Sequence, residues 1–201
     1  FVMNIYPLET WAYRLSHIGG GLVLGYLIFG ASTVRVDGPM PRSATNLALL
    51  AVAAAGIGWG LVALLAIWIN GTLGANPVPP SWAMTSFGIP LFVGSVAAVA
   101  HSWLFPHQRK DRFSAADILL AVASAVAIFY VIFFARQLQL RAGMPMALPS
   151  DMWAAITGVL LIVELTRRLA GLALVIIAGV FVAYAFLGPW LPGILQHRGY
   201  E

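Results

Sequence analysis

The chain has 201 residues, of which 61% are hydrophobic and only 9% are charged, and its net charge is +4. So few charged side chains cannot cover an ordinary core of this size, which excludes water as the main solvent and predicts a protein that lies in a lipid bilayer. The absence of Cys excludes disulfides and thiolate metal sites, and the scatter of single Arg residues between apolar runs is typical of membrane topology signals, so no nucleic-acid partner is expected.

Apolar runs long enough to cross a membrane are the main signal in the sequence. A helix needs about 20 mostly apolar residues to span the hydrocarbon layer, and we searched for such runs between polar or Pro/Gly segments. They predict an all-α fold, a polytopic transmembrane bundle of about six helices. In chain order the predicted helices cover residues 15–34, 45–69, 84–105, 114–134, 151–165 and 169–187.

The helix boundaries carry further signals. Ser114 is a plausible N-cap of the fourth helix, with Asp117 in its first turn, where the helix dipole favours an acid. The fifth helix is short, because its uninterrupted apolar part covers only residues 152–163, and it spans only if Glu164 and Arg167 lie at the interface. Four Trp residues near the ends of runs are typical of interfacial anchors: Trp82, Trp103, Trp153 and Trp190.

The runs divide the chain into three regions. Residues 1–14 form a predicted N-terminal interfacial segment, residues 15–147 a four-helix membrane region, and residues 148–201 a helical hairpin.

Basic residues in alternate loops predict the orientation, provided that all six runs span. The side with more basic residues is expected to be cytoplasmic, which places both termini outside. Seven basic residues fall on the predicted cytoplasmic side, namely Arg35, Arg42, Arg109, Lys110, Arg112, Arg167 and Arg168, and four on the other, namely Arg14, Arg136, Arg141 and Arg198.

Two pairs of glycines have the spacing that lets helices approach closely. Gly21 and Gly25 lie four residues apart in the first run, and Gly56 and Gly60 in the second. Glycine removes the side chain between two backbones, so these pairs are either packing positions or, since such spacing arises easily in Gly-rich helices, positions without a special role.

Two histidines lie in or near predicted spans and raise the possibility of a haem or chlorin pigment. His17 begins the first span at the outer face, whereas His101 lies about one turn before the inner end of the third. A bis-histidine haem is excluded because the two rings would lie at different depths. Ligation of a pigment by one of them is the weaker alternative to a histidine whose hydrogen bonds are made by a partner or by water, so we expect no cofactor.

Asp117 and Glu164, both near predicted helix ends, are the candidates for acids within the membrane. An acid in a membrane often marks an ion path, but Glu164 has Arg167 three and Arg168 four residues later on the same helix face. We therefore expect a structural ion pair of Glu164 with these arginines rather than a transport role. No phosphate-binding loop, zinc motif or nucleophile elbow is found, and no catalytic residue or metal site is expected.

The last quarter of the chain resembles a known family. An acid opens a short apolar helix, a Glu-Leu-Thr-Arg-Arg string follows, and Gly-Pro, Pro-Gly and His-Arg-Gly-Tyr elements come at fixed distances after it. The matching residues are Asp151, Leu161 to Arg168, Gly171 to Leu174, Phe181, Tyr184, Gly188-Pro189, Leu191 to Gly193 and His197 to Tyr200. This pattern is similar to the fused membrane permeases of tripartite ATP-independent periplasmic (TRAP) transporters of the TAXI type. More weakly, the third and fourth runs, with Leu104-Phe105-Pro106 ending one helix and Asp117 opening the next, look like their small-subunit portion.

The resemblance implies a non-catalytic scaffold in the bacterial inner membrane, similar to the small membrane subunit of such a transporter. Its implied partners are a separate large membrane subunit and, through the transporter, a periplasmic solute-binding protein. The alternative is an accessory transmembrane subunit of a larger respiratory or photosynthetic complex, derived from a truncated permease. The sequence given stops before the region that forms the transport domain in the family, and this keeps the alternative open.

Overall fold

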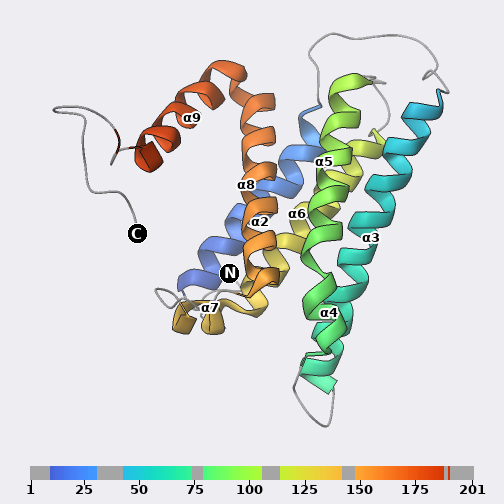
Figure 1. Ribbon diagram of the computed structural model, residues 1–201, viewed down its shortest axis with the longest axis vertical. Helices are drawn as coiled ribbons and strands as arrows, with labels where there is room; N and C mark the ends of the chain where they lie inside the picture. Colours follow the sequence, from blue (N-terminus) through green and yellow to red (C-terminus); the bar gives the residue numbers. More distant parts are fainter. Residues whose placement is uncertain are drawn as a thin grey trace.

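The computed structural model describes residues 10–30, 43–73, 79–105, 114–141, 148–187 and 190, and Figure 1 shows their arrangement. This part of the chain is all-helical and has no strands. Its helices are α2 (Thr10–Ile28), α3 (Ala44–Leu73), α4 (Ser81–Ser86), α5 (Gly88–Leu104), α6 (Ala115–Phe133), α7 (Ala135–Arg141), α8 (Pro149–Ala170) and α9 (Leu172–Leu187).

Three helices are long and apolar enough, by length and composition, to cross a membrane. They cover Ala44–Thr72, Ser81–Leu104, which joins α4 to α5, and Ala115–Phe133. The six predicted runs all correspond to helices, but α2, α8 and α9 do not meet both criteria. Helix α9 has 16 residues, α8 carries four charged side chains, and the first half of α2 is polar. The prediction of six spans therefore exceeds what length and composition support.

The third predicted helix contains an interruption at Phe87, between α4 and α5. Pro90 lies four residues after Ser86 and has no N–H to donate to its carbonyl, so the regular hydrogen-bond ladder is broken there. The Phe87 ring is fully buried and stacks on the ring of Tyr130, with centroids 4.5 Å apart.

Helix α8 is longer than the predicted fifth helix of residues 151–165. It has 22 residues and continues through Glu164, Arg167 and Arg168 to Ala170. The prediction was wrong about this end because the charged side chains pair with one another and with neighbouring helices instead of ending the helix. The helix stops at Gly171, whose φ of +82° lies in the left-handed region that favours glycine.

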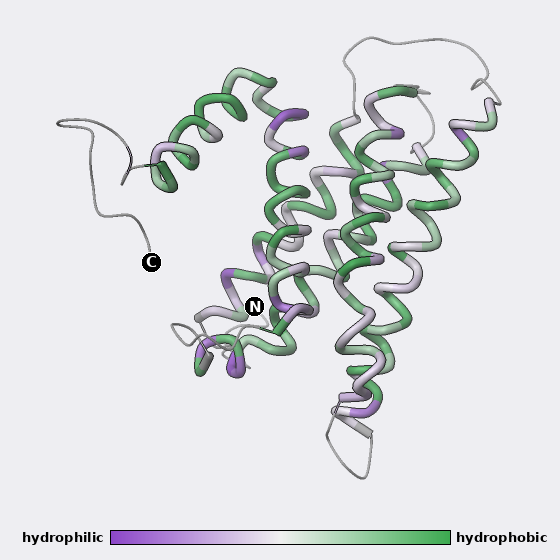
Figure 2. Tube along the Cα trace, in the orientation of Figure 1, coloured by the Kyte–Doolittle hydropathy of each residue, from purple (hydrophilic) through white to green (hydrophobic). Residues whose placement is uncertain are grey.

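The helices of the bundle alternate in direction. At the upper end in Figure 1, α2, α5 and α8 end while α3 and α6 begin. In Figure 2 apolar residues dominate the helices, while hydrophilic positions gather near the upper end of α8 and on α7 at the lower end. Of the basic residues used for the topology prediction, Arg35, Arg42, Arg109, Lys110, Arg112 and Arg198 lie outside the described residues.

Helices α3 and α5 pack closely at a pair of glycines. A Cβ atom added to Gly56 would lie 2.9 Å from Cα of Gly94, and one added to Gly60 would lie 3.1 Å from Cβ of Leu91. In the first pair, a Cβ on Gly25 would meet the side chain of Leu165 on α8. A Cβ atom on Gly21 would meet no atom within 4 Å, so Gly21 brings no helices together among the described residues.

Candidate functional site

The most distinctive polar feature is a cluster of ionic and aromatic side chains at the upper end of the bundle. It joins the last turns of α8 to three other helices. We call it the α8 charge network, and it consists of Tyr26 from α2, Trp103 from α5, Asp117 from α6, and Glu164, Arg167 and Arg168 from α8.

Glu164 is the centre of the network. Its carboxylate is buried and accepts hydrogen bonds at both oxygens. Arg167 donates from Nε to Oε2 and from Nη2 to Oε1, each over 2.8 Å, while Arg168 donates from Nε to Oε1 over 2.8 Å. The indole Nε1 of Trp103 donates to Oε2 over 3.0 Å. Four hydrogen bonds from three side chains fix this carboxylate in one orientation.

Arg168 links α8 to α6 and α2. Its side chain is fully buried, and its Nη1 lies 2.6 Å from Oδ1 of Asp117. The same nitrogen donates to the carbonyl oxygen of Phe29, just after α2, over 3.1 Å. The guanidinium also lies over the ring of Tyr26, 4.8 Å from its centroid, and the Tyr26 hydroxyl donates to the Leu161 carbonyl of α8 over 2.7 Å.

Arg167 lies at the edge of the network. Its side chain is 21% exposed, and its guanidinium lies 4.9 Å from the centroid of the Trp103 ring. Trp103 is more than half exposed, so this cation–π contact faces outward, where a tryptophan is typical of the membrane interface.

The charges of the network balance. Two carboxylates, Asp117 and Glu164, face two guanidinium groups, and each carboxylate has a guanidinium partner within 2.8 Å. An isolated charge at such a depth would be very costly, whereas paired and hydrogen-bonded charges are tolerated. The arrangement suits a structural connection between helices and leaves no carboxylate of the network unpaired.

A second polar contact holds α8 at its other end. The hydroxyl of Tyr130 on α6 donates to Oδ1 of Asp151 over 2.7 Å and lies 2.9 Å from Oγ of Ser150. Helix α8 is therefore tied to α6 by polar side chains near both its first and its last turn.

The two candidate histidines lie in different parts of the bundle. His17 is exposed in the first half of α2, where its Nδ1 lies 3.1 Å from the carbonyl oxygen of Tyr13. His101 is fully buried near the end of α5, with Nε2 2.8 Å from Oδ1 of Asn46 and no partner at Nδ1 among the described residues.

A pigment does not fit His101 as the chain is folded here. The ring of His101 has no exposed surface from which a haem or chlorin could approach, and His17 lies on an open helix face beside the ring of Tyr13. Within the described ranges, no group of three or more His, Cys, Asp or Glu residues could hold a metal ion.

The sequence prediction named Glu164, Arg167 and Arg168 but missed their partners on other helices. Tyr26, Trp103 and Asp117 were not assigned to this site, because spacing within one helix does not say which helix packs beside it. One signal was present in α8 itself. Ser150, Thr157 and Glu164 recur every seven residues on one helix face and are all buried, which marks that face as directed inward.

No family model, curated protein or solved structure matches this chain. Its function is therefore argued from the site and from the resemblance in its last quarter.

Proposed function

We propose that this chain is a non-catalytic membrane scaffold that braces a larger membrane subunit, similar in role to the small membrane subunit of a TAXI-type TRAP transporter. The proposal includes six membrane crossings, location in the bacterial inner membrane, and a periplasmic solute-binding protein as a further component of the assembly.

The observation that carries the proposal is the pairing of both carboxylates in the α8 charge network. The charged side chains that lie deepest, Asp117, Glu164 and Arg168, are bonded to one another instead of pointing into an open polar site. Residues that bind and release an ion or an organic acid need polar groups free to exchange partners near the middle of the membrane. A network whose carboxylates are all paired is better explained by a rigid scaffold than by a path for transported ions.

The outer surface of the bundle agrees with a protein that has neighbours in the membrane. Helix α9 is apolar, and none of its described residues is buried. In a bilayer such a helix contacts lipid or the helices of another subunit, and a bracing subunit requires surface of this kind.

Co-purification tests the proposal directly. A tagged chain extracted in mild detergent is expected to bring down a large membrane subunit of a transporter, identified by mass spectrometry. The chain reconstituted alone is expected to show no sodium-dependent uptake of organic acids. Uptake by this polypeptide alone would contradict the scaffold role, and recovery of respiratory or photosynthetic subunits instead would favour the accessory-subunit alternative.

A further inference from the structure

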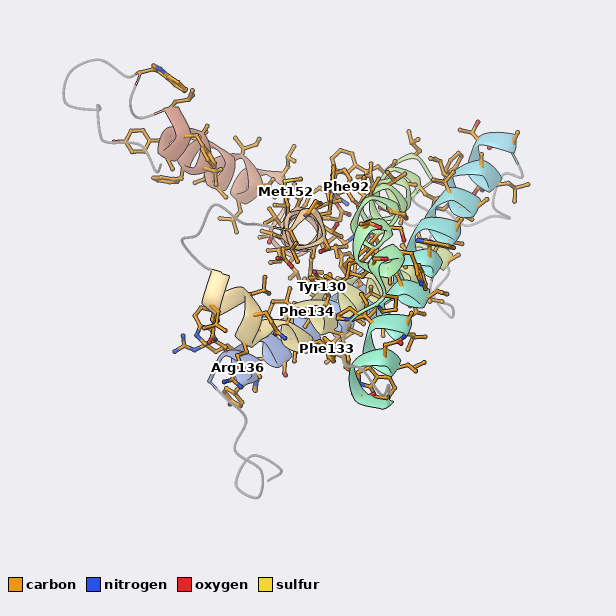
Figure 3. The ribbon with its side chains drawn as sticks, turned by 60° about the horizontal axis from the view of Figure 1, so that its bottom comes forward. Phe92, Tyr130, Phe133, Phe134, Arg136 and Met152 are labelled. Carbon is orange, nitrogen blue, oxygen red and sulfur yellow. The ribbon has the colours of Figure 1, made fainter. Side chains whose placement is uncertain are left out.

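A group of exposed basic, aromatic and apolar residues lies at the opposite end of the bundle from the α8 charge network. It is formed where α7 turns away beside the start of α2, as Figures 1 and 3 both show. We call it the α2–α7 patch, and it consists of Trp11, Tyr13, Arg14, Arg136 and Leu140.

The fold of α7 presents this patch outward. Helix α6 ends at Phe133. The next residue, Phe134, has a φ of −96° and a ψ of 10°, which lie outside helical values, and α7 begins after it at Ala135. Phe134 and Ala135 are buried and Leu138 packs on the core, so one side of α7 is anchored to the bundle. The opposite side carries Arg136 and Leu140, which lie one helical turn apart and are both exposed.

The two arginines differ from those of the α8 charge network in having no counter-ion among the described residues. Arg14 and Arg136 are exposed, and neither forms an ion pair within the part of the chain that the structure describes. Helices α2 and α7 contain no acidic residue. The acid at this end of α8, Asp151, accepts the hydrogen bond of Tyr130.

The surroundings of these charges are apolar and aromatic. Trp11 is 55% exposed, Tyr13 41% and Leu140 68%. Trp11 lies three residues before Arg14 on the same face of α2. Tryptophan and tyrosine beside arginine are the residues that settle at the level of lipid headgroups, with apolar side chains directed into the acyl region.

We infer that the α2–α7 patch binds the headgroups of anionic phospholipids. Exposed guanidinium groups bind phosphate oxygens well. The exposed side chains of Leu140 and Trp11 fit an acyl chain and the headgroup level of a membrane. A soluble anion would use the arginines but not the apolar part of the patch. This inference is independent of the proposed scaffold role.

The test uses the full chain in phospholipid vesicles. Because the chain has no Cys, Gln139→Cys, at an exposed position of α7, can carry a single fluorophore. Quenching by brominated phosphatidylglycerol is compared with quenching by brominated phosphatidylcholine. The labelled chain is expected to prefer phosphatidylglycerol, and the preference should fall about five-fold for each arginine removed in Arg14→Gln and Arg136→Gln.

Three controls separate this result from a change in folding. Ser16→Ala, at an exposed uncharged position of α2, should keep the preference, and Arg136→Lys should keep most of it. Raising the salt concentration should weaken the preference of the unsubstituted labelled chain. Equal quenching by the two lipids at low salt would overturn the inference. So would competition by millimolar inorganic phosphate at constant ionic strength, since it would assign the patch to soluble anions.

Discussion

Arg168 of α8 contacts Asp117 of α6, Nη1 to Oδ1 over 2.6 Å, although 51 positions separate them in the sequence. Both side chains are almost completely buried. This pair connects the predicted hairpin of residues 148–201 to the predicted four-helix region of residues 15–147. The sequence alone predicted these two regions as separate segments and gave no contact between them.

Removing one partner of this pair should be costly. Asp117→Ala leaves the network with two guanidinium groups and one carboxylate, Glu164, which Arg167 and Arg168 then share, and is expected to lower the free energy of unfolding by about 3–5 kcal/mol. The double substitution Asp117→Leu with Arg168→Met should recover most of that loss, because it removes both charges. Thermal unfolding in detergent measures both. A double variant as unstable as the single one would contradict the ion-pair explanation.

The two arginines next to Glu164 should contribute unequally. Arg168→Gln is expected to destabilise the fold far more than Arg167→Gln, because the side chain of Arg168 is fully buried and that of Arg167 is 21% exposed. A partly exposed pair contributes only about 1 kcal/mol. Equal losses for the two variants in a chemical unfolding series would show that burial does not govern this network.

Glu164→Gln tests whether the central carboxylate is structural. It removes the negative charge that three donor side chains share, so thermal stability and recovery of the assembled complex should both decrease. If stability and recovery stayed unchanged while uptake by the full assembly was lost, Glu164 would belong to a transport path and the structural assignment would be wrong.

The α3–α5 contact can be tested with glycine substitutions. Gly56→Ala places a Cβ 2.9 Å from Cα of Gly94, so the helices must separate, at a cost of about 1–3 kcal/mol. Gly58→Ala is the matched control, since no atom lies within 4 Å of its added Cβ. Its stability should be unchanged or slightly higher, because alanine favours a helix. Similar losses in both variants would argue against a specific contact at Gly56.

Cysteine labelling checks the predicted orientation. In intact cells Arg141→Cys should react with an impermeant reagent and Arg109→Cys should not, because the side richer in Lys and Arg is expected to face the cytoplasm. Labelling of position 109 from outside would show that the predicted orientation is inverted.

Local sequence patterns predicted local structure well and distant contacts poorly. Apolar length found the main helices, and three- and four-residue spacing brought Glu164 together with Arg167 and Arg168. Asp117 was interpreted only through its position in the first turn of a helix, whereas its guanidinium partner comes from α8. Helix α7 was missed because its charged and polar residues resemble a loop, and its anchoring by Leu138 depends on the bundle beneath it.

Gly171, with its left-handed backbone, separates two helices in which substitutions are expected to affect stability differently. Before it, α8 has six buried residues, so substitutions on its buried face are expected to destabilise the bundle. After it, α9 makes its extensive contact only with α8 among the described helices, and none of its residues is buried. Substitutions in α9 are therefore expected to leave the rest of the described bundle folded, so this helix is the natural place to graft a new binding specificity.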